Sequence, residues 1–122
     1  MANPATLTLV AEAVADVWGV SVADLRGPRR FPRLVNPRHA AFALSIMHTG
    51  QSMAAVGRWF GDRDHKTVIN GIRRFNEMLV KADAERIAEA ERLIFLRCRA
   101  TFFRHSSLVF VSSRGRHAAV AA

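Results

Sequence analysis

The middle of the chain contains a run of five polar residues, Arg63-Asp64-His65-Lys66-Thr67. The run supplies a guanidinium, a carboxylate, an imidazole, an ammonium and a hydroxyl group. Side chains of these types can bond to base edges and to phosphates. Asn70 and Arg73 follow Lys66 after four and seven residues, which places the three on one face of a helix. These seven residues are the first candidates for chemistry, and that chemistry is the recognition of nucleic acid.

Two helices must position the polar run. The helix before it begins after Ser52, ends at Gly61 and shows apolar residues on one face: Met53, Val56 and Phe60. Asp64 can cap the second helix, whose apolar stripe recurs every three or four residues: Val68, Ile72, Phe75 and Leu79. Gly57 lies inside the first helix, where a close approach between helices would explain it.

A helix, a turn with glycine and a longer helix predict a helix-turn-helix, whose second helix enters the major groove with its N-terminal residues at the base edges. Periodicity alone equally fits a plain helical hairpin with a solvated polar face. The charge distribution favours the first interpretation. Residues 26–74 carry ten bases and two acids, and their net charge of +8 equals that of the whole chain. A basic block that coincides with this motif is typical of a nucleic-acid-binding protein.

An arginine-rich segment precedes the motif. Residues 26–36 contain two prolines and a glycine, which predict an irregular loop. Arg26, Arg29, Arg30 and Arg33 lie close together there with no carboxylate among them. Phosphates or a narrow minor groove would stabilise such a loop, although it could also be a solubilising surface loop.

The next helix is expected to begin at Asn36 as N-cap and Pro37 as first residue. Arg38 and His39 would then lie in its first turn, where free backbone N–H groups and Arg38 could bind a phosphate. His39 is more often a surface residue than a ligand.

The remaining segments predict packing elements. A helix over residues 5–18, with Asn3 and Pro4 at its start and Gly19 at its end, precedes a short capping box that opens at Ser21. A last helix over residues 83–104 shows a broad apolar face that packs on the other helices and could also serve as a dimer surface. Residues 106–122 are expected to form a disordered tail. The expectation is an all-α, compact helical domain over residues 1–105.

Other function classes find little support. Cys98 is the only cysteine, so we expect neither an internal disulfide nor a structural zinc, and its surroundings indicate a buried small hydrophobe. No apolar run reaches the length of a membrane span, and the N-terminus lacks a secretory signal, which favours a cytoplasmic, nucleoid-associated protein. His65 and Asp64 are adjacent on a helix and diverge by about 100°, so they do not predict an enzyme site.

The chain resembles the C-terminal DNA-binding domain of DnaA, the bacterial chromosomal replication initiator, from about residue 6 to residue 103. The strongest likeness is Val56-Gly-Arg-Trp-Phe-Gly-Asp-Arg-Asp-His-Lys-Thr-Val68. Val22-Ala-Asp-Leu25, the arginine-rich loop and Pro37-Arg38 match in the same order and spacing.

The resemblance implies a Trp-repressor-like helix-turn-helix that binds double-stranded DNA without a cofactor. It implies that an arginine at the position of Arg30 enters the minor groove, and that Pro37, Arg38 and His39 form a DNA-contacting helix start. The segment Arg63–Thr67 would contact bases and phosphates. Arginine suits guanine and phosphate, aspartate can accept from the cytosine amino group, and a threonine methyl suits thymine.

Three positions depart from the family. Lys66 stands where the family has threonine, His39 replaces glutamine, and Asp62 replaces glycine. The 122 residues also hold no G-x-x-x-x-G-K-[ST] motif, so the family's ATPase is not expected in them. The sequence therefore predicts a stand-alone regulator of transcription or replication. The alternative is a protein-interaction module of the same fold that binds DNA only non-specifically and contacts replication or transcription proteins.

Overall fold

The computed structural model describes residues 5–102, and within them every regular element is a helix. The elements are listed in chain order: α1 (Leu7–Trp18), α2 (Val22–Arg26), α3 (Pro32–Thr49), α4 (Met53–Trp59), α5 (His65–Arg74), the π-helical turn η1 (Phe75–Leu79), α6 (Val80–Ala82) and α7 (Ala84–Phe102). The all-α prediction is confirmed. The expected tail, residues 106–122, lies outside the described residues.

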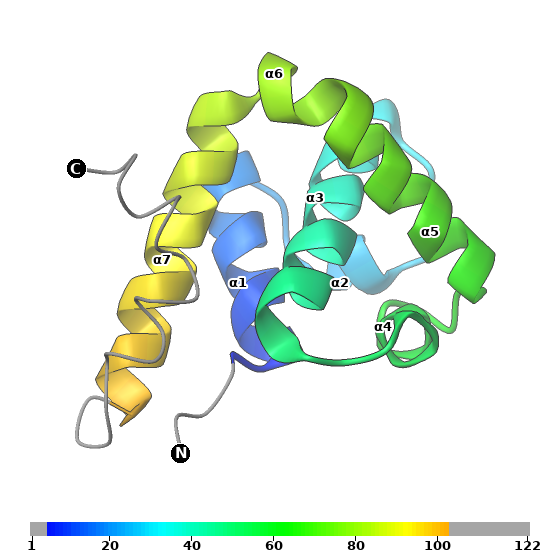
Figure 1. The fold of residues 1–122 in the computed structure, drawn as a ribbon. Coiled ribbons are helices and arrows are strands. Elements are labelled where there is room, and N and C mark those ends of the chain that lie inside the picture. The colour runs from blue at the N-terminus through cyan, green and yellow to red at the C-terminus, as the bar shows by residue number, and fades with distance from the viewer. Residues whose placement is uncertain (1–4, 103–122) are drawn as a thin grey trace.

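Helix α3 runs through the middle of the molecule, with α1 and α7 on one side and α4 and α5 on the other (Figure 1). Its residues Ala40 to Ser45 are all buried, so the helix contacts neighbours on every side over this stretch. The ring of Phe42 meets the ring of Phe60 edge to face, with centroids 5.5 Å apart. This aromatic pair joins α3 to the end of α4, and therefore fixes the helix-turn-helix to the core.

Helix α7 packs along α1 through the apolar stripe that the sequence predicts, with Ile87, Ala90, Ile94 and Cys98 buried. Polar contacts to α1 and to the end of α3 also hold α7 in place. Nη2 of Arg97 donates to Asp16 in α1 at 2.6 Å, and Nε2 of His48 at the end of α3 lies 3.1 Å from Oε2 of Glu91. Burial also raises the pKa of the Cys98 thiol. The expected small buried hydrophobe is confirmed at that position.

The helix-turn-helix has the predicted caps. Ser52 accepts a bond from Ala55 N at 3.1 Å, and Oδ1 of Asp64 accepts a long one from Lys66 N at 3.5 Å. Between the helices, Gly61 and Asp62 both have positive φ, which glycine adopts freely and aspartate adopts more readily than most residues. The apolar stripe of the second helix is buried at Val68, Phe75 and Leu79. The helix does not run on regularly, because η1 widens it by one π-helical turn after Arg74.

Two glycines let these helices approach closely. A Cβ at Gly57 would overlap the carbonyl oxygen of Arg63, and a Cβ at Gly71 would lie 2.7 Å from Cδ2 of Phe42. The close approach predicted from Gly57 is confirmed, with the backbone of the turn as the contacting element.

Two predicted helix starts are wrong. The helix expected from Asn36 and Pro37 begins five residues earlier, because Pro32 takes the first position after Phe31 and Pro37 is accommodated inside the helix. The irregular segment is therefore confined to residues 27–31. Helix α1 begins at Leu7 with Thr6 as its cap, and not at Asn3 and Pro4, because Oγ1 of Thr6 accepts from Leu9 N at 3.0 Å.

Candidate nucleic-acid interface

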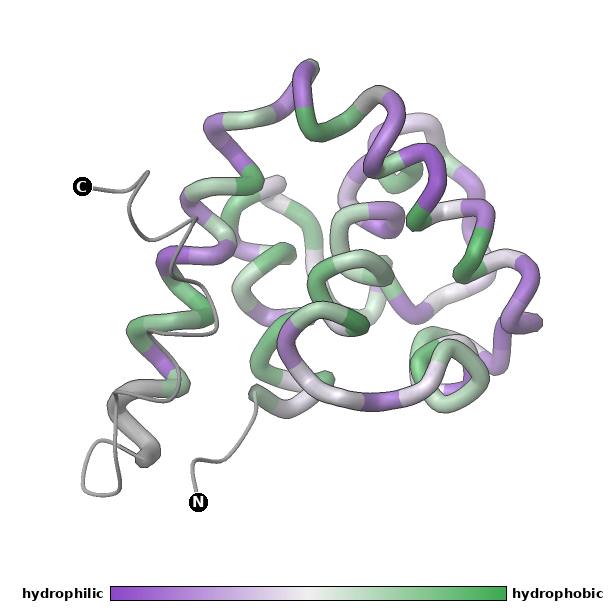
Figure 2. Tube along the Cα trace, viewed as in Figure 1, coloured by the Kyte–Doolittle hydropathy of each residue, from purple (hydrophilic) through white to green (hydrophobic). Residues whose placement is uncertain are grey.

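Helix α5 presents a polar face on the side away from the core. Val68 and Gly71 are buried, whereas the predicted contact residues at the start and along the outer side are exposed: Asp64, His65, Lys66, Thr67, Asn70 and Arg73. Figure 2 shows hydrophilic residues in the turn before α5 and hydrophilic and hydrophobic residues alternating along the helix. The amide oxygen of Asn70 accepts a bond from Nη2 of Arg73, so these two side chains are held together. These six side chains therefore form a solvent-exposed polar face along α5.

Asp64 and His65 form a pair at the tip of this face. Oδ1 of Asp64 lies 3.1 Å from Nδ1 of His65, and both side chains are more than half exposed. A carboxylate on Nδ1 orients the imidazole and leaves Nε2 free. This arrangement suits a histidine that contacts a base or a phosphate with its outer nitrogen.

The structure turns Arg63 inward. Its Nη1 donates to the carbonyl of Phe60 at the end of α4, and its Nη2 donates to the carbonyl of Gly27 at 2.7 Å. Burial lowers its pKa below the ordinary arginine value, and the charge of Arg30 lowers it further. The guanidinium therefore links the turn before α5 to the loop between α2 and α3. The prediction that Arg63 contacts bases remains untested.

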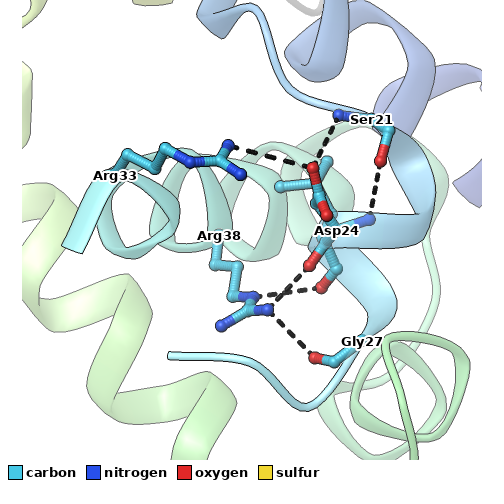
Figure 3. Close-up of polar contacts among 6 residues, drawn as sticks. Ser21, Asp24, Gly27, Arg33 and Arg38 are labelled. Atoms are coloured by element: carbon cyan, nitrogen blue, oxygen red, sulfur yellow. Dashed lines mark hydrogen bonds and ion pairs between the residues drawn. The ribbon is translucent and has the colours of Figure 1, made fainter. Parts of the chain in front are cut away.

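Arg38 is also engaged inside the protein, and its expected place in a helix first turn is wrong because α3 begins at Pro32. The residue is only 7 % exposed. Its guanidinium donates to three carbonyls around the end of α2: Asp24 at 2.7 Å, Leu25 at 3.2 Å and Gly27 at 2.9 Å (Figure 3). Burial is the main cause that lowers its pKa, followed by Arg63, while Asp24 raises it and Arg30 lowers it. Pro37 beside it is fully buried.

The arginine-rich segment is exposed at Arg29 and Arg30 in the loop and at Arg33, which lies in the first turn of α3 and not in the loop as predicted. Within residues 5–102, Arg29 and Arg30 form no ion pair, and Arg33 lies 3.8 Å from the carboxylate of Asp24. Arg30 lowers the pKa of both Arg38 and Arg63, so positive charge accumulates here, with Asp24 as a partial counter-charge. Such a cluster attracts a polyanion.

His39 is a residue of α3 whose side chain faces Gly71 of α5, and it is half-buried. Burial lowers its pKa from the ordinary 6.5, and Arg74 lowers it further. A Cβ at Gly71 would lie 3.1 Å from Cδ2 of this histidine, so the imidazole packs against the inner side of α5. The structure thus brings His39 beneath the predicted contact helix and not onto its outer face.

Comparison with known proteins agrees with this geometry. The family model described as bacterial dnaA protein helix-turn-helix matches residues 7–75, more than half of the chain. The chain belongs to the DnaA helix-turn-helix family. The matched region holds α1 to α5, and hence the arginine-rich loop, the turn and the exposed face of α5. Membership in this family implies DNA as the partner.

The curated relatives are chromosomal replication initiator proteins DnaA. The protein of Brucella abortus is 41 % identical over 80 residues, which are 66 % of this chain and 16 % of that protein. Those of Wolbachia pipientis and Roseobacter denitrificans are each 34 % identical, over 72 % and 62 % of this chain and 19 % and 17 % of theirs. The chain thus spans less than a fifth of the length of these relatives. No helix within residues 5–102 is long and apolar enough to cross a membrane.

Sequence reasoning missed three features of this DnaA-type surface. Arg26 caps α4 from a distance: its Nε donates to the carbonyl of Trp59 at 2.7 Å and its guanidinium lies 4.1 Å from the centre of the indole. Ile69 is 43 % exposed among the polar residues of α5, and Phe31 is equally exposed in the arginine-rich loop. Ile69 and Phe31 could have been noticed in the sequence, because each is an apolar residue among polar neighbours. The contact of Arg26 with Trp59 could not, because it depends on tertiary structure.

Proposed function

We propose that this chain binds double-stranded DNA sequence-specifically. The start of α5 lies in the major groove, and the loop of Arg29 and Arg30 lies in the adjacent minor groove. The observation that carries the proposal is the bond from Arg63 to Gly27, which ties the turn before α5 to that loop across 36 residues. Two segments fixed to each other can span two neighbouring grooves without rearrangement, and this lowers the entropic cost of binding.

The exposed residues take different roles in this proposal. His65, Lys66 and Thr67 meet base edges, since they lie at the N-terminal end of the helix that enters the groove. Asp64 holds His65 and accepts from a base amino group where the site offers one. Asn70 and Arg73, about one and two turns beyond Lys66, contact the phosphate backbone as one unit. Arg30 enters the minor groove, and Arg29 and Arg33 contact the flanking phosphates.

Four predicted contact residues take a positioning role instead. The guanidinium groups of Arg38 and Arg63 both donate to Gly27, so they hold the loop and do not need to leave the protein. His39 packs beneath α5 beside Gly71. Pro37 is buried and supports the same region of α3.

The biological role that fits this binding is regulation of transcription or replication on the nucleoid, through sites that resemble those of the initiator. The relatives are initiators, and the 122 residues contain the matched DNA-binding region without a phosphate-binding G-x-x-x-x-G-K-[ST] loop. These residues would occupy an initiator site without nucleotide control of their own. Competition with a full-length initiator for its sites follows from that arrangement.

Fluorescence anisotropy on two labelled duplexes, at low and at physiological salt, tests the proposal. One duplex carries a site recovered by random-site selection with the protein, and the other carries a scrambled version. We expect a difference of roughly 4 kcal/mol or more in binding free energy. Arg30→Ala and His65→Ala should reduce that difference, whereas Arg86→Ala should not, because Arg86 lies on α7 and pairs with Asp83.

Sequence specificity would be refuted if the protein bound both duplexes with equal affinity and dissociated from both over the same range of rising salt. Binding would then come only from electrostatic contacts to the phosphates. The alternative of a protein-interaction module would then apply. Its signature would be a stable oligomer or complex in size-exclusion chromatography with light scattering.

A further inference from the structure

Phe31 occupies a position where another residue type would stabilise the fold more. It is the N-cap of α3 and makes no side-chain cap bond, although serine, threonine, asparagine and aspartate are the stabilising residues there. It also gains little from burial, since 43 % of it is exposed. Residues that break a local rule with little compensating gain are expected at functional positions.

The backbone presents Phe31 rigidly. Pro32 follows it at the first position of α3 and restricts Phe31 to an extended conformation, observed at φ −62° and ψ 141°. The carbonyl of Phe31 accepts a bond from Leu34 N at 2.9 Å, which fixes it to the first turn. The aromatic ring therefore enters a complex without losing backbone freedom on binding.

Arginines flank the ring. The guanidinium of Arg29 lies 5.6 Å from the ring centre and that of Arg33 lies 5.7 Å from it, and Arg30 is the immediate neighbour. Within residues 5–102 only Arg33 of these three pairs with a carboxylate, at 3.8 Å. An apolar protein partner would have to desolvate this charge, whereas a DNA groove neutralises it while offering base faces to the ring.

Resting on the proposed function, we propose that Phe31 is an apolar wedge that enters the minor groove beside Arg30 and unstacks one base step. Insertion of apolar side chains between base pairs from the minor groove is an established means of distorting a duplex. Pyrimidine–purine steps unstack most easily, so the wedge also adds sequence preference at a position where no hydrogen bond to a base is made. Arg29 and Arg33 then hold the phosphates on either side.

The test uses the full chain and duplexes of a selected site in which 2-aminopurine, whose fluorescence rises on unstacking, replaces one purine at a time. Three variants are compared with the wild type. Phe31→Ser removes the ring and supplies a helix cap, and Phe31→Leu retains an apolar wedge. Met47→Ala is the matched control, since Met47 is 45 % exposed on α3, the helix that Phe31 precedes, roughly 24 Å further along its axis.

We expect the wild type, Phe31→Leu and Met47→Ala to raise the fluorescence at one position in the arginine-loop half of the site. Phe31→Ser should abolish the rise and bind roughly three- to tenfold more weakly, because lost stacking is partly offset by the avoided unstacking. Its melting temperature should stay equal or increase, which separates the effect from misfolding. A Phe31→Ser protein with unchanged fluorescence and affinity would overturn the wedge and leave sequence-specific binding intact. A wild type with no preference for the selected site would overturn both proposals.

Discussion

Arg63 donates through Nη2 to the carbonyl oxygen of Gly27 at 2.7 Å, although the two residues are 36 positions apart. The same carbonyl accepts from Nη2 of Arg38 at 2.9 Å. One backbone oxygen therefore joins α3, the loop after α2 and the turn of the helix-turn-helix. The relative position of the loop and of α5 depends on these two guanidinium groups.

Replacing Arg63 with lysine should loosen this junction. A lysine ammonium carries the same charge but cannot span the carbonyls of Phe60 and Gly27 with a planar fork. We expect a loss of about 1–2 kcal/mol in the free energy of unfolding, measured by urea denaturation. Specific DNA affinity should fall more than non-specific affinity, because the net charge is unchanged while the two segments are no longer held together.

Arg86→Lys on α7 is the control for that substitution, since it changes the same side chain in an exposed pair with Asp83. It should alter neither stability nor affinity measurably. If Arg63→Lys kept full stability and lost only contacts at one base pair of the selected site, Arg63 would be a base-contacting residue, as the family resemblance implies.

Arg38→Met should be the more damaging change to the fold. It removes the donors to three carbonyls of a buried region, at Asp24, Leu25 and Gly27. We expect the free energy of unfolding to fall by about 3 kcal/mol or more. Below the melting temperature of the variant, the slope of log affinity against log salt should match that of the wild type, because no phosphate contact is lost.

Arg30→Ala serves as the comparison for Arg38→Met, because it should change the salt dependence of DNA binding and not the stability of the fold. Within residues 5–102 the exposed Arg30 forms no ion pair, so stability should be unchanged. The salt slope should fall by about 0.9, because one cation that lies between the phosphates in the minor groove is removed. A stable Arg38→Met protein with that reduced slope would show that Arg38 contacts a phosphate.

The sequence was sufficient where local rules decide the structure. The capping box at Ser21, the cap at Asp64, the stop at Gly61 and the apolar stripe through Val68 each follow from residues within a few positions. The same rules misplaced the start of α3, because Asn36-Pro37 is as good a helix start as Phe31-Pro32 by itself. Burial of Leu34 and of Pro37 in the core decides between the two starts, and burial depends on tertiary packing.

In the candidate site, too, some features follow from local sequence and others depend on tertiary structure. The exposed face of His65, Lys66 and Asn70 follows from helical spacing, and the structure displays it as predicted. The inward direction of Arg38 and Arg63 does not follow from spacing, because the carbonyls that accept their bonds belong to a loop 11 and 36 positions away. Long-range acceptors of this kind leave no periodic signal in a sequence.

Lys66→Thr should return the chain toward the family's residue at this position. The exposed ammonium at the start of α5 is expected to contact a phosphate or a guanine, whereas threonine offers a methyl group to thymine. The salt slope should decrease by about 0.9, and random-site selection should give thymine at one position where the wild type selects another base. Identical selected sites for both proteins would remove Lys66 from the set of base-contacting residues. Lys81→Thr, an exposed lysine of α6, controls for loss of charge alone.

His39→Gln should change the pH dependence of stability. Burial and then Arg74 lower the pKa of His39 below 6.5 in the folded chain, so the unfolded chain takes up the proton first as the pH falls through 6.5. Acid therefore favours unfolding. Above pH 6.5 His39 is neutral in both states, and it no longer makes the free energy of unfolding depend on pH. The free energy of unfolding should be measured by urea denaturation about one pH unit above and one pH unit below 6.5. Between these two pH values it should fall more for the wild type than for the variant. Equal losses would mean that His39 does not titrate differently in the two states.

Gly57→Ala should separate α4 from the turn that carries Arg63. Alanine favours a helix by about 1 kcal/mol over glycine, so a solvent-facing site would be stabilised by this change. At Gly57 the added Cβ overlaps the carbonyl oxygen of Arg63 and lies 3.4 Å from Cγ2 of Val68. Backbone cannot yield as a flexible side chain does, so we expect a net loss of about 2 kcal/mol or more in the free energy of unfolding.

The consequence of Gly57→Ala for DNA binding follows from the same geometry. Displacing the Arg63 carbonyl also displaces its guanidinium from Gly27, so specific affinity should fall as it does in Arg63→Lys, with an unchanged salt slope. Ala54→Ser, an exposed change on the same helix, should leave both properties near the wild type. If the double variant Gly57→Ala with Arg63→Lys lost no more specific affinity than either single variant, both changes would act through the junction at Gly27. Additive losses would show that α4 positions α5 by a route independent of that carbonyl.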